Sequence, residues 1–397
     1  MHMSIGRIRA KEREFTISTY LEKRLGQLRM KIVFVLNALV MGGAEKHAID
    51  LARRLSESGA DSSFFAIRRG DFEPEGIRLS QPCADERYSL QKRVSALARI
   101  LASESPELIV CVNDRPLMVA SVARMLSRQK AKIVVIEHSS IFRNRKEALL
   151  DWFYRSFQNR ADCMVFISEN QRKLWLSRGV APRSSVTILN GVDMLRFSLS
   201  EREKFRAATR ARLGFTQEDV VLGCCAVLRP EKNHAQLLEI IARLGPTSSL
   251  KALMVGDGPT RGALEERASE MGISNRVVFV GAHHDVRPYL AAFDLGALCS
   301  VAIETLSLAA LEALAMGVPM LMSDIGGASE IVNGQNGAVF PVGDTQKLAE
   351  LVQRFRSESG SDRLQAQVRA SVEAKFGHER MASEYFEAFR ELIQRRD

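Results

Sequence analysis

Two glutamates in the last third of the chain, Glu304 and Glu312, have seven residues between them and flank a predicted helix start. Ser307 is a good N-cap residue, and the apolar side chains after it recur at helical spacing as far as Ala315. We therefore expect Glu304 on a strand-to-helix loop and Glu312 on the helix. In a parallel sheet this loop lies at the carboxyl edge, where such folds bind ligands. Taken alone, the pair also fits an ordinary βαβ unit with two surface glutamates.

Two cations, Arg229 and Lys232, occupy an earlier strand-to-helix turn. The turn follows a predicted strand over residues 220–227 and precedes a helix predicted from His234 to about Leu244. An arginine offers a planar fork of donors and a lysine a point charge, so the two together suit a diphosphate. A solvated turn with no ligand fits the same residues equally well.

Glycines mark two further turns of the same kind. Gly256 and Gly258 belong to a Gly-x-Gly-x-x-x-Gly pattern, one residue longer than the dinucleotide fingerprint, which favours a tight turn beside a ligand over an NAD site. Gly42 and Gly43 follow the first predicted strand, Met30–Leu36. Glycines there let backbone N–H groups approach an anion with the help of the helix dipole, although any tight turn also favours glycine.

Among the histidines, one is a candidate ligand-binding residue and one adjacent pair is not interpreted as a metal site. His138 follows the predicted strand 133–136 at its carboxyl end, which makes it a candidate ligand-binding residue. The run His283-His284-Asp285 is interpreted as an ordinary loop, because adjacent histidines cannot readily share one metal ion and no further ligand set lies nearby. We expect no metal site.

The elements that must position these residues alternate between strand and helix, which predicts an α/β protein with parallel, doubly wound sheets. Two such series of similar size imply two domains with a cleft between their carboxyl edges, and the boundary is predicted near residue 197. The predicted strands are 30–36, 64–67, 108–112, 133–136 and 164–167 in the first series, and 220–227, 252–255, 277–280, 295–298 and 318–322 in the second. The predicted helices of the first series are 44–58, 94–103, 116–127 and 147–159.

Length and composition agree with this organisation. The chain has 397 residues, enough for two domains with sizeable cores. No apolar run reaches membrane-spanning length, and the first 30 residues lack the continuous hydrophobic region of a secretory signal, so a cytoplasmic location is the default expectation. The six cysteines show no C-x-x-C spacing and are interpreted as free, mostly buried thiols.

The net charge of +9 is unevenly distributed. Residues 1–29 carry +4 and residues 30–200 carry +8, whereas residues 201–397 carry −3. The basic front half suggests an anionic partner: an anionic lipid, a phosphorylated acceptor or a nucleic acid. Nucleic acid ranks last because no RNA-binding signature with interleaved aromatic residues is present. A solvated basic surface fits the charge as well as any specific partner.

Several short motifs, taken together and in this order, carry a resemblance that none carries alone. These motifs are Gly42-Gly43-Ala-Glu-Lys, Asn190-Gly-Val-Asp193, Arg229-x-x-Lys232-Asn, Gly256-Asp-Gly258-Pro259, Glu304-x7-Glu312, Met316-Gly-Val-Pro319 and Gly326-Gly-x-x-Glu330. With them the chain resembles glycosyltransferase family 4, retaining enzymes of the GT-B fold, over roughly residues 30–385. Ala226, Val227 and Leu228 depart from the pattern, since a glycine commonly precedes the Arg-x-x-Lys turn.

The resemblance implies a role for each candidate residue. Arg229 and Lys232 would bind the nucleotide diphosphate and stabilise it as a leaving group, and His138 would contact the sugar near its anomeric centre. Glu312 would hold the ribose hydroxyls, and Glu304, with the backbone of Thr305 to Ser307, would face the donor sugar and its phosphate. The remaining donor-binding positions are Gly42, Gly43, Gly256, Gly258, Thr305, Leu306 and Ser307. Family members generally need no metal, and the sequence contains no Asp-x-Asp motif.

The resemblance also assigns the parts of the chain. Residues 1–29 would be an extension, dispensable if Met30 is the natural start. Residues 30–197 would bind the acceptor, residues 198–377 the nucleotide sugar, and residues 378–397 would form a closing helix that packs back on the first domain.

The predicted function is retaining transfer of a sugar from a UDP- or GDP-linked donor to a saccharide or lipid-linked acceptor, at the inner face of the plasma membrane. Three alternatives remain open at this stage. They are a GT-B sugar-nucleotide epimerase, a non-catalytic sugar-nucleotide binder and a peripheral membrane scaffold.

Overall fold

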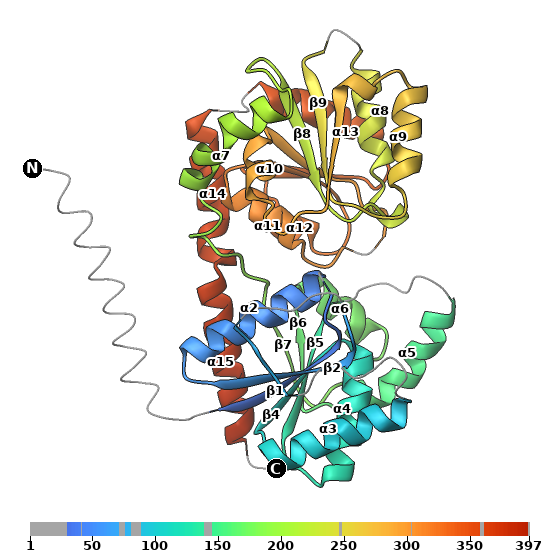
Figure 1. Cartoon of the computed structure of the whole chain (residues 1–397), viewed down its shortest axis with the longest axis vertical. Helices are drawn as coiled ribbons and strands as arrows, with labels where there is room; N and C mark the ends of the chain where they lie inside the picture. The colour runs from blue at the N-terminus through green and yellow to red at the C-terminus, as the bar shows by residue number, and fades with distance from the viewer. Residues whose placement is uncertain are drawn as a thin grey trace, which may run out of the picture. The chain divides into compact units, whose positions relative to one another are not determined.

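The computed structural model of the chain is drawn in Figure 1. It describes residues 30–40, 42–70, 76–80, 89–138, 145–245, 248–302, 304–357 and 361–395. The N-terminal extension and Cys83 lie outside these ranges.

Strands and helices alternate along the chain. The strands are β1 Lys31–Ala38, β2 Asp61–Arg68, β3 Arg78–Leu79, β4 Leu108–Val112, β5 Lys132–Glu137, β6 Cys163–Phe166, β7 Ser185–Thr187, β8 Val220–Cys225, β9 Leu250–Val255, β10 Val277–Gly281, β11 Leu295–Leu298, β12 Met320–Ser323 and β13 Gly337–Phe340. The helices are α2 Gly43–Glu57, α3 Leu90–Glu104, α4 Asp114–Ser127, α5 Arg145–Gln158, α6 Glu169–Ser177, α7 Leu199–Arg212, α8 Ala235–Arg243, α9 Arg261–Glu270, α10 Arg287–Ala292, α11 Leu308–Ala315, α12 Ala328–Ile331, α13 Thr345–Arg356, α14 Asp362–Phe376 and α15 His378–Gln394.

The strands form two sheets, and their neighbours pair in parallel. The described strands order as β3-β2-β1-β4-β5-β6-β7 in one sheet and β10-β9-β8-β11-β12-β13 in the other. In both sheets the chain runs outward in one direction, returns to the middle and continues the other way, as in a doubly wound Rossmann-like fold. The predicted α/β class with two parallel sheets is confirmed.

Burial on both faces explains why the strands are continuous apolar runs. Every residue of β4, β11 and β12 is buried. Two strand glycines make room for large neighbours. A Cβ on Gly223 would lie 2.1 Å from the ring of Phe293, and one on Gly296 would lie 2.1 Å from the sulfur of Met320. These positions are small because the core on either side is full.

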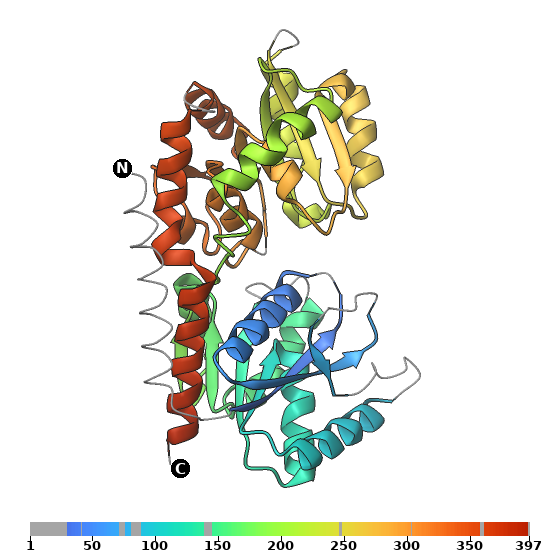
Figure 2. The ribbon, with the colours of Figure 1, turned by 60° about the vertical axis from the view of Figure 1, so that its left-hand side comes forward.

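The chain divides into two compact units. One comprises Met1–Cys111 with Val119–Ile133, and the other comprises Val112–Met118 with Val134–Asp397. The second unit contains the whole β8–β13 sheet, with α8 and α9 on one side of it and α7 and α10 on the other (Figure 1). Within the same unit α14 and α15 follow one another along one side (Figure 2). The predicted domain boundaries stay predictions.

The boundaries of several elements differ from those predicted, and for two strands the structure shows the physical reason. The strand predicted over 220–227 ends at Cys225, because the next residues leave the sheet and pass over the β9–α9 turn. The strand predicted over 318–322 is Met320–Ser323, since Pro319 precedes it and has no N–H for the ladder. Strands β3, β7 and β13 and helices α6, α7, α10, α12, α13 and α14 were not predicted as elements.

Candidate functional site

The loop between β11 and α11 carries Glu304. Ser307 begins α11 and accepts a hydrogen bond from the N–H of Ala310 at 3.3 Å, so the predicted N-cap is confirmed. Glu304 is 7% exposed, and Glu312, on α11, is 6% exposed. Neither is therefore a surface glutamate of an ordinary βαβ unit. A buried carboxylate needs partners that compensate its lost hydration.

Two donors meet one oxygen of Glu304. Lys232 Nζ donates to Oε2 at 2.7 Å, and Ser300 Oγ donates to the same atom at 2.8 Å. Lys232 ends the 3-10 turn Pro230–Lys232 between β8 and α8. The N–H of Val301 donates to the carbonyl of Glu231 at 2.9 Å, which ties this turn to the β11–α11 loop. The other oxygen, Oε1, has no hydrogen-bond partner among the described residues.

Further hydrogen-bond donors at this edge of the sheet have no partner among the described residues. Arg229 is exposed, and its guanidinium has no ion pair or hydrogen bond in the described ranges. The N–H groups of Leu308 and Ala309, in the first turn of α11, likewise have no partner in the part of the chain that the structure describes. Helix N-terminal N–H groups and arginines are typical anion-binding groups. These donors can therefore bind an anionic group.

Gly256 and Gly258 support the loop that leads to Arg229. Both have positive φ, 140° and 159°. A Cβ on Gly256 would lie 2.0 Å from the carbonyl oxygen of Ala226, and one on Gly258 would lie 2.4 Å from that of Leu228. Glycine is needed here so that two backbone segments can approach each other. Whether either glycine also contacts a ligand stays a prediction.

The structure brings Thr305 and His138 together. The Thr305 hydroxyl donates to the carbonyl of His138 at 2.9 Å. The His138 N–H in turn donates to Oδ1 of Asn113 at 2.8 Å. Asn113 directly follows β4 and has a φ of 67°. The backbone of His138 is thus held at the carboxyl end of β5, beside the loop of Glu304.

The backbone of the loop from Glu304 to Leu306 is held by residues from two other segments. Asn190, only 2% exposed, donates its amide N–H to the carbonyl of Leu306 at 3.1 Å. Gly327 donates its N–H to the carbonyl of Thr305 at 2.8 Å. A Cβ on Gly326 would lie 1.5 Å from the carbonyl oxygen of Glu304, so only glycine fits there. The loop is therefore preorganised by its surroundings.

Gly42 and Gly43 belong to the other compact unit. Gly42 is the N-cap of α2 with extended backbone, and Gly43 is the first residue of that helix. Their predicted contact with a donor stays a prediction.

Burial shifts the pKa values of two groups near Lys232, His234 and Cys224. The ring of His234 is 2% exposed, and burial, with Lys232 adding to it, lowers the pKa of His234 to about 4. Burial raises the pKa of the Cys224 thiol to about 12. His234 is therefore neutral at physiological pH, and Cys224 is a protonated core thiol. All five cysteines within the described ranges are free, and four of them are buried.

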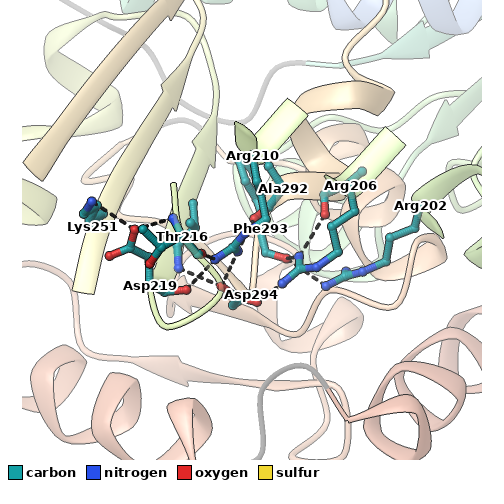
Figure 3. Close-up of polar contacts among 11 residues, drawn as sticks. Arg202, Arg206, Arg210, Thr216, Asp219, Lys251, Ala292, Phe293 and Asp294 are labelled. Atoms are coloured by element: carbon teal, nitrogen blue, oxygen red, sulfur yellow. Dashed lines mark hydrogen bonds and ion pairs between the residues drawn. The ribbon is translucent and has the colours of Figure 1, made fainter. Parts of the chain in front are cut away.

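A second buried ion cluster lies at the opposite end of β11. Figure 3 shows Arg202, Arg206 and Arg210 of α7 reaching toward Asp294, the residue just before the strand. Arg206 binds Oδ1 of Asp294, and Arg210 binds Oδ2 at 2.9 Å. Arg202 donates to the carbonyl of Phe293 at 2.8 Å. Burial lowers the pKa of Arg202 to about 9.

Two residues near Glu304 were missed as candidates. Ser300 lies two positions beyond the predicted strand 295–298, where a polar residue at a carboxyl edge was a usable signal. Asn190 was noted only as part of the Asn-Gly-Val-Asp motif, and nothing in the sequence says that its side chain reaches Leu306. Among the described residues, no group of three His, Cys, Asp or Glu side chains could hold a metal ion.

Most of the chain matches known family descriptions. Residues 41–196 match the family described as Glycosyltransferase Family 4, and residues 219–357 match the family described as Glycosyl transferases group 1. The chain belongs to glycosyltransferase family 4. This family 4 member has the GT-B fold of two Rossmann-like sheets.

Relatives of this family 4 member include proteins of known name. One is the GDP-mannose-dependent monoacylated alpha-(1-6)-phosphatidylinositol monomannoside mannosyltransferase of Corynebacterium glutamicum, 29% identical over 237 residues. That match covers 57% of this chain and 61% of the relative. Another is the lipopolysaccharide core biosynthesis glycosyltransferase LpsE of Rhizobium meliloti, 26% identical over 87% of this chain and 95% of that protein.

Solved structures share the fold of this family 4 member. The structure of Anabaena Alr3699/HepE in complex with UDP has a TM-score of 0.76 and 24% identity, and the match covers 91% of this chain and 100% of that one. A glycosyltransferase from Rickettsia africae has a TM-score of 0.78 and 17% identity, over 93% and 100% of the two chains.

Proposed function

We propose that the protein is a retaining glycosyltransferase that moves a sugar from a UDP- or GDP-linked donor to a saccharide or lipid-linked acceptor, without a divalent metal. Its role would lie in bacterial-type cell-surface polysaccharide or glycolipid synthesis. The observation that carries this proposal is the Lys232–Glu304 ion pair, whose carboxylate is buried and whose second carboxylate oxygen has no partner among the described residues. The names of the C. glutamicum and R. meliloti relatives support the same class of reaction.

Lys232 would bind two groups in the proposed donor site, the carboxylate of Glu304 and the diphosphate of the donor. An ammonium has three N–H donors, and one of them is used by Glu304. The others are available to the diphosphate, whose negative charge grows as the bond to the sugar breaks. Arg229 and the α11 N-terminus add donors to the same charge, and such prepositioned donors lower the barrier without reorganising. Glu304 meanwhile presents Oε1 to the sugar.

A screen of nucleotides and nucleotide sugars tests the donor assignment. UDP, GDP, UDP-glucose, UDP-galactose, UDP-N-acetylglucosamine and GDP-mannose would be compared by thermal shift, since a ligand that binds the folded state raises its melting temperature. The best donor would then be incubated with candidate saccharide and lipid-linked acceptors. The product should keep the anomeric configuration of the donor in NMR spectra, and a chelator should leave turnover unchanged.

Each competing function has its own outcome in this experiment. A non-catalytic binder would show the thermal shift with no product. An epimerase would change the donor sugar without an acceptor. An inverted linkage, or full inhibition by chelator alone, would contradict the proposed mechanism.

The proposal includes peripheral contact with an anionic membrane at its cytoplasmic face. No described helix is both long and apolar enough to cross a bilayer. Helix α5 instead exposes two large aromatic side chains, Trp152 at 73% and Phe153 at 48%, in the basic front half of the chain. Exposed aromatic residues near basic ones favour the membrane interface.

Vesicle flotation tests this contact. Binding to phosphatidylglycerol vesicles should exceed binding to phosphatidylcholine vesicles and should fall with salt, because charges are screened within about 10 Å at 0.1 M. The change Trp152→Ala with Phe153→Ala should weaken binding. Leu195→Ala, at a position that is 79% exposed, is the matched control and should not. Equal binding to both vesicle types would contradict the membrane contact.

A further inference from the structure

We propose that Ser300 is a positioning residue that holds Glu304 in the orientation needed for sugar transfer. The inference rests on the proposed function, because it assigns Ser300 a part in the same donor site. Ser300 follows β11 by two residues and is 1% exposed. Its hydroxyl donates to Glu304 Oε2 at 2.8 Å. A hydrogen bond to a charged acceptor is stronger than one between neutral groups.

The two donors on Oε2 determine which oxygen of Glu304 is left for a ligand. Ser300 and Lys232 both bind Oε2, at 2.8 and 2.7 Å. Oε1 has no partner among the described residues, so it is the oxygen that can accept a hydrogen bond from a sugar hydroxyl. The two oxygens are chemically equivalent, so the two donors fix the plane of the carboxylate and the direction in which the unbonded oxygen points. Turning the carboxylate out of that plane would break both hydrogen bonds.

Ser300 and Lys232 differ in what else they bind. Lys232 is also the proposed partner of the diphosphate, so its ammonium must bind both the Glu304 carboxylate and the diphosphate during the reaction. Ser300 is buried, and among the described residues its hydroxyl bonds only Glu304. The N–H of Val301, the next residue, is fixed to the carbonyl of Glu231 at 2.9 Å. Ser300 therefore keeps Glu304 aligned while Lys232 responds to the departing phosphate.

A second serine provides a matched control. Ser323 ends β12, the strand beside β11, and like Ser300 it is 1% exposed. Its hydroxyl is buried and has no hydrogen-bond partner within the described ranges. Ser323→Ala therefore removes the same buried atom from the neighbouring strand without touching Glu304. Any effect specific to Ser300→Ala comes from the bond to the carboxylate.

The test compares Ser300→Ala with Ser323→Ala, using the donor that the screen selects. Ser300→Ala should lower kcat by about tenfold to a hundredfold, the range for a lost hydrogen bond to a charged group. The affinity for free UDP or GDP should change much less than kcat, because a free nucleotide lacks the sugar that Glu304 is proposed to face. Ser323→Ala should match the unmodified protein in both measurements. If Ser300→Ala does not fold, Ser300→Cys keeps the volume with a weaker donor and should give a smaller loss.

A double-mutant cycle separates positioning from a structural role. In a Glu304→Gln background Ser300→Ala should cause no further loss of kcat, because residues that act as one unit are not additive. An equal further loss, or a normal kcat for Ser300→Ala alone, would overturn the inference.

A failure of the proposed function would look different, since no variant or unmodified protein would then turn over any nucleotide sugar. Ser300 remains testable even in that case. Ser300→Ala should reduce the extra affinity that the sugar adds over the free nucleotide, and an unchanged difference would overturn the inference.

Discussion

The two ends of β11 each hold a buried carboxylate among cations, and they differ in how completely that carboxylate is used. Asp294 precedes the strand and is 5% exposed, and Glu304 follows it and is 7% exposed. Both oxygens of Asp294 are bonded, to Arg206, to Arg210 and to the N–H of Val221. Within the part of the chain that the structure describes, only one oxygen of Glu304 is bonded. We call Asp294 with Arg206 and Arg210 the saturated cluster, and Glu304 with Lys232, Ser300 and Arg229 the open cluster. The saturated cluster can only stabilise the fold, whereas the open cluster can also bind a ligand.

The arginines of the saturated cluster are also occupied on their other sides. Arg206 donates to the carbonyls of Ala291 and Phe293, and Arg210 donates to that of Asp219 at 2.5 Å (Figure 3). Ala291 lies in the last turn of α10 and Phe293 is its C-cap, where the helix dipole favours cations. At the other end of β11 Arg229 has no partner in the described residues. Polar groups left open at a carboxyl edge are thus the better guide to function.

The largest effect should come from breaking the open cluster. Arg229→Ala combined with Lys232→Ala should reduce turnover by at least about a hundredfold, because each lost contact costs about 3 kcal/mol of transition-state stabilisation. The two losses need not add, since both groups act on one leaving group. Steady-state kinetics measure the change, and thermal melting should show the fold intact. Retained turnover would remove both cations from the mechanism.

Breaking the saturated cluster should affect stability instead. Asp294→Asn leaves buried arginines without their carboxylate, and breaking a buried ion pair typically costs about 3–5 kcal/mol of unfolding free energy. Urea denaturation measures the loss. At temperatures where the variant is still folded its kcat should be normal. A near-normal stability, or a specific loss of kcat, would contradict the distinction between the two clusters.

The pH dependence of stability tests a buried group near the open cluster, His234. Neither ring nitrogen of His234 has a partner among the described residues. Burial lowers its pKa to about 4, below the value of about 6.5 in the unfolded chain. Between these values the unfolded chain binds more protons, so stability is full above pH 6.5 and falls as the pH drops toward 4. The loss from this group should be about 2 kcal/mol between pH 7.5 and 5.

His234→Gln is the variant that isolates this contribution. It should show a shallower fall of unfolding free energy from pH 7.5 to 5 than the unmodified protein in urea denaturation. Identical pH dependence of the two proteins would show that His234 is not held neutral by burial.

The smallest effect concerns Glu312, which shares the α11 segment with Glu304. If Glu312 accepts hydrogen bonds from the ribose, Glu312→Ala should weaken binding of free UDP or GDP by about tenfold, the scale of one such bond. Calorimetry measures the affinity, and the fold should remain intact. Unchanged nucleotide affinity would remove Glu312 from the site.

The sequence was sufficient for the α/β class because strand burial on both faces leaves unbroken apolar runs such as Leu295–Leu298. It was not sufficient for α7, which looked charged and uneven. The side of that helix that packs on Asp294 and the neighbouring carbonyls carries arginines at four-residue spacing, Arg202 and Arg210 buried and Arg206 half-buried, rather than apolar side chains. A pattern based on hydrophobicity cannot detect a helix that buries its cations on a carboxylate and on carbonyls.

Prediction of the candidate site had a similar limit. Glu304, Lys232 and Ser307 were identified because strand-to-helix turns place polar residues at one edge of a sheet. The pairing of Lys232 with Glu304 could not be read from the sequence, since 71 residues separate them and no local rule sets their contact. Asn190 and Ser300 act through single bonds formed only after folding. Such contacts follow from tertiary packing and not from spacing.

Hydrogen–deuterium exchange with and without nucleotide tests most directly whether the open end of β11 is the donor site. The protein would be saturated with whichever of UDP and GDP raises its melting temperature. We predict slower exchange of the amides in 229–233 and 304–310, where open donors surround Lys232 and Glu304. Exchange in 216–221 and 290–295, around Asp294, should not change. Protection confined to the Asp294 end, or no protection at 229–233 and 304–310, would contradict the assignment.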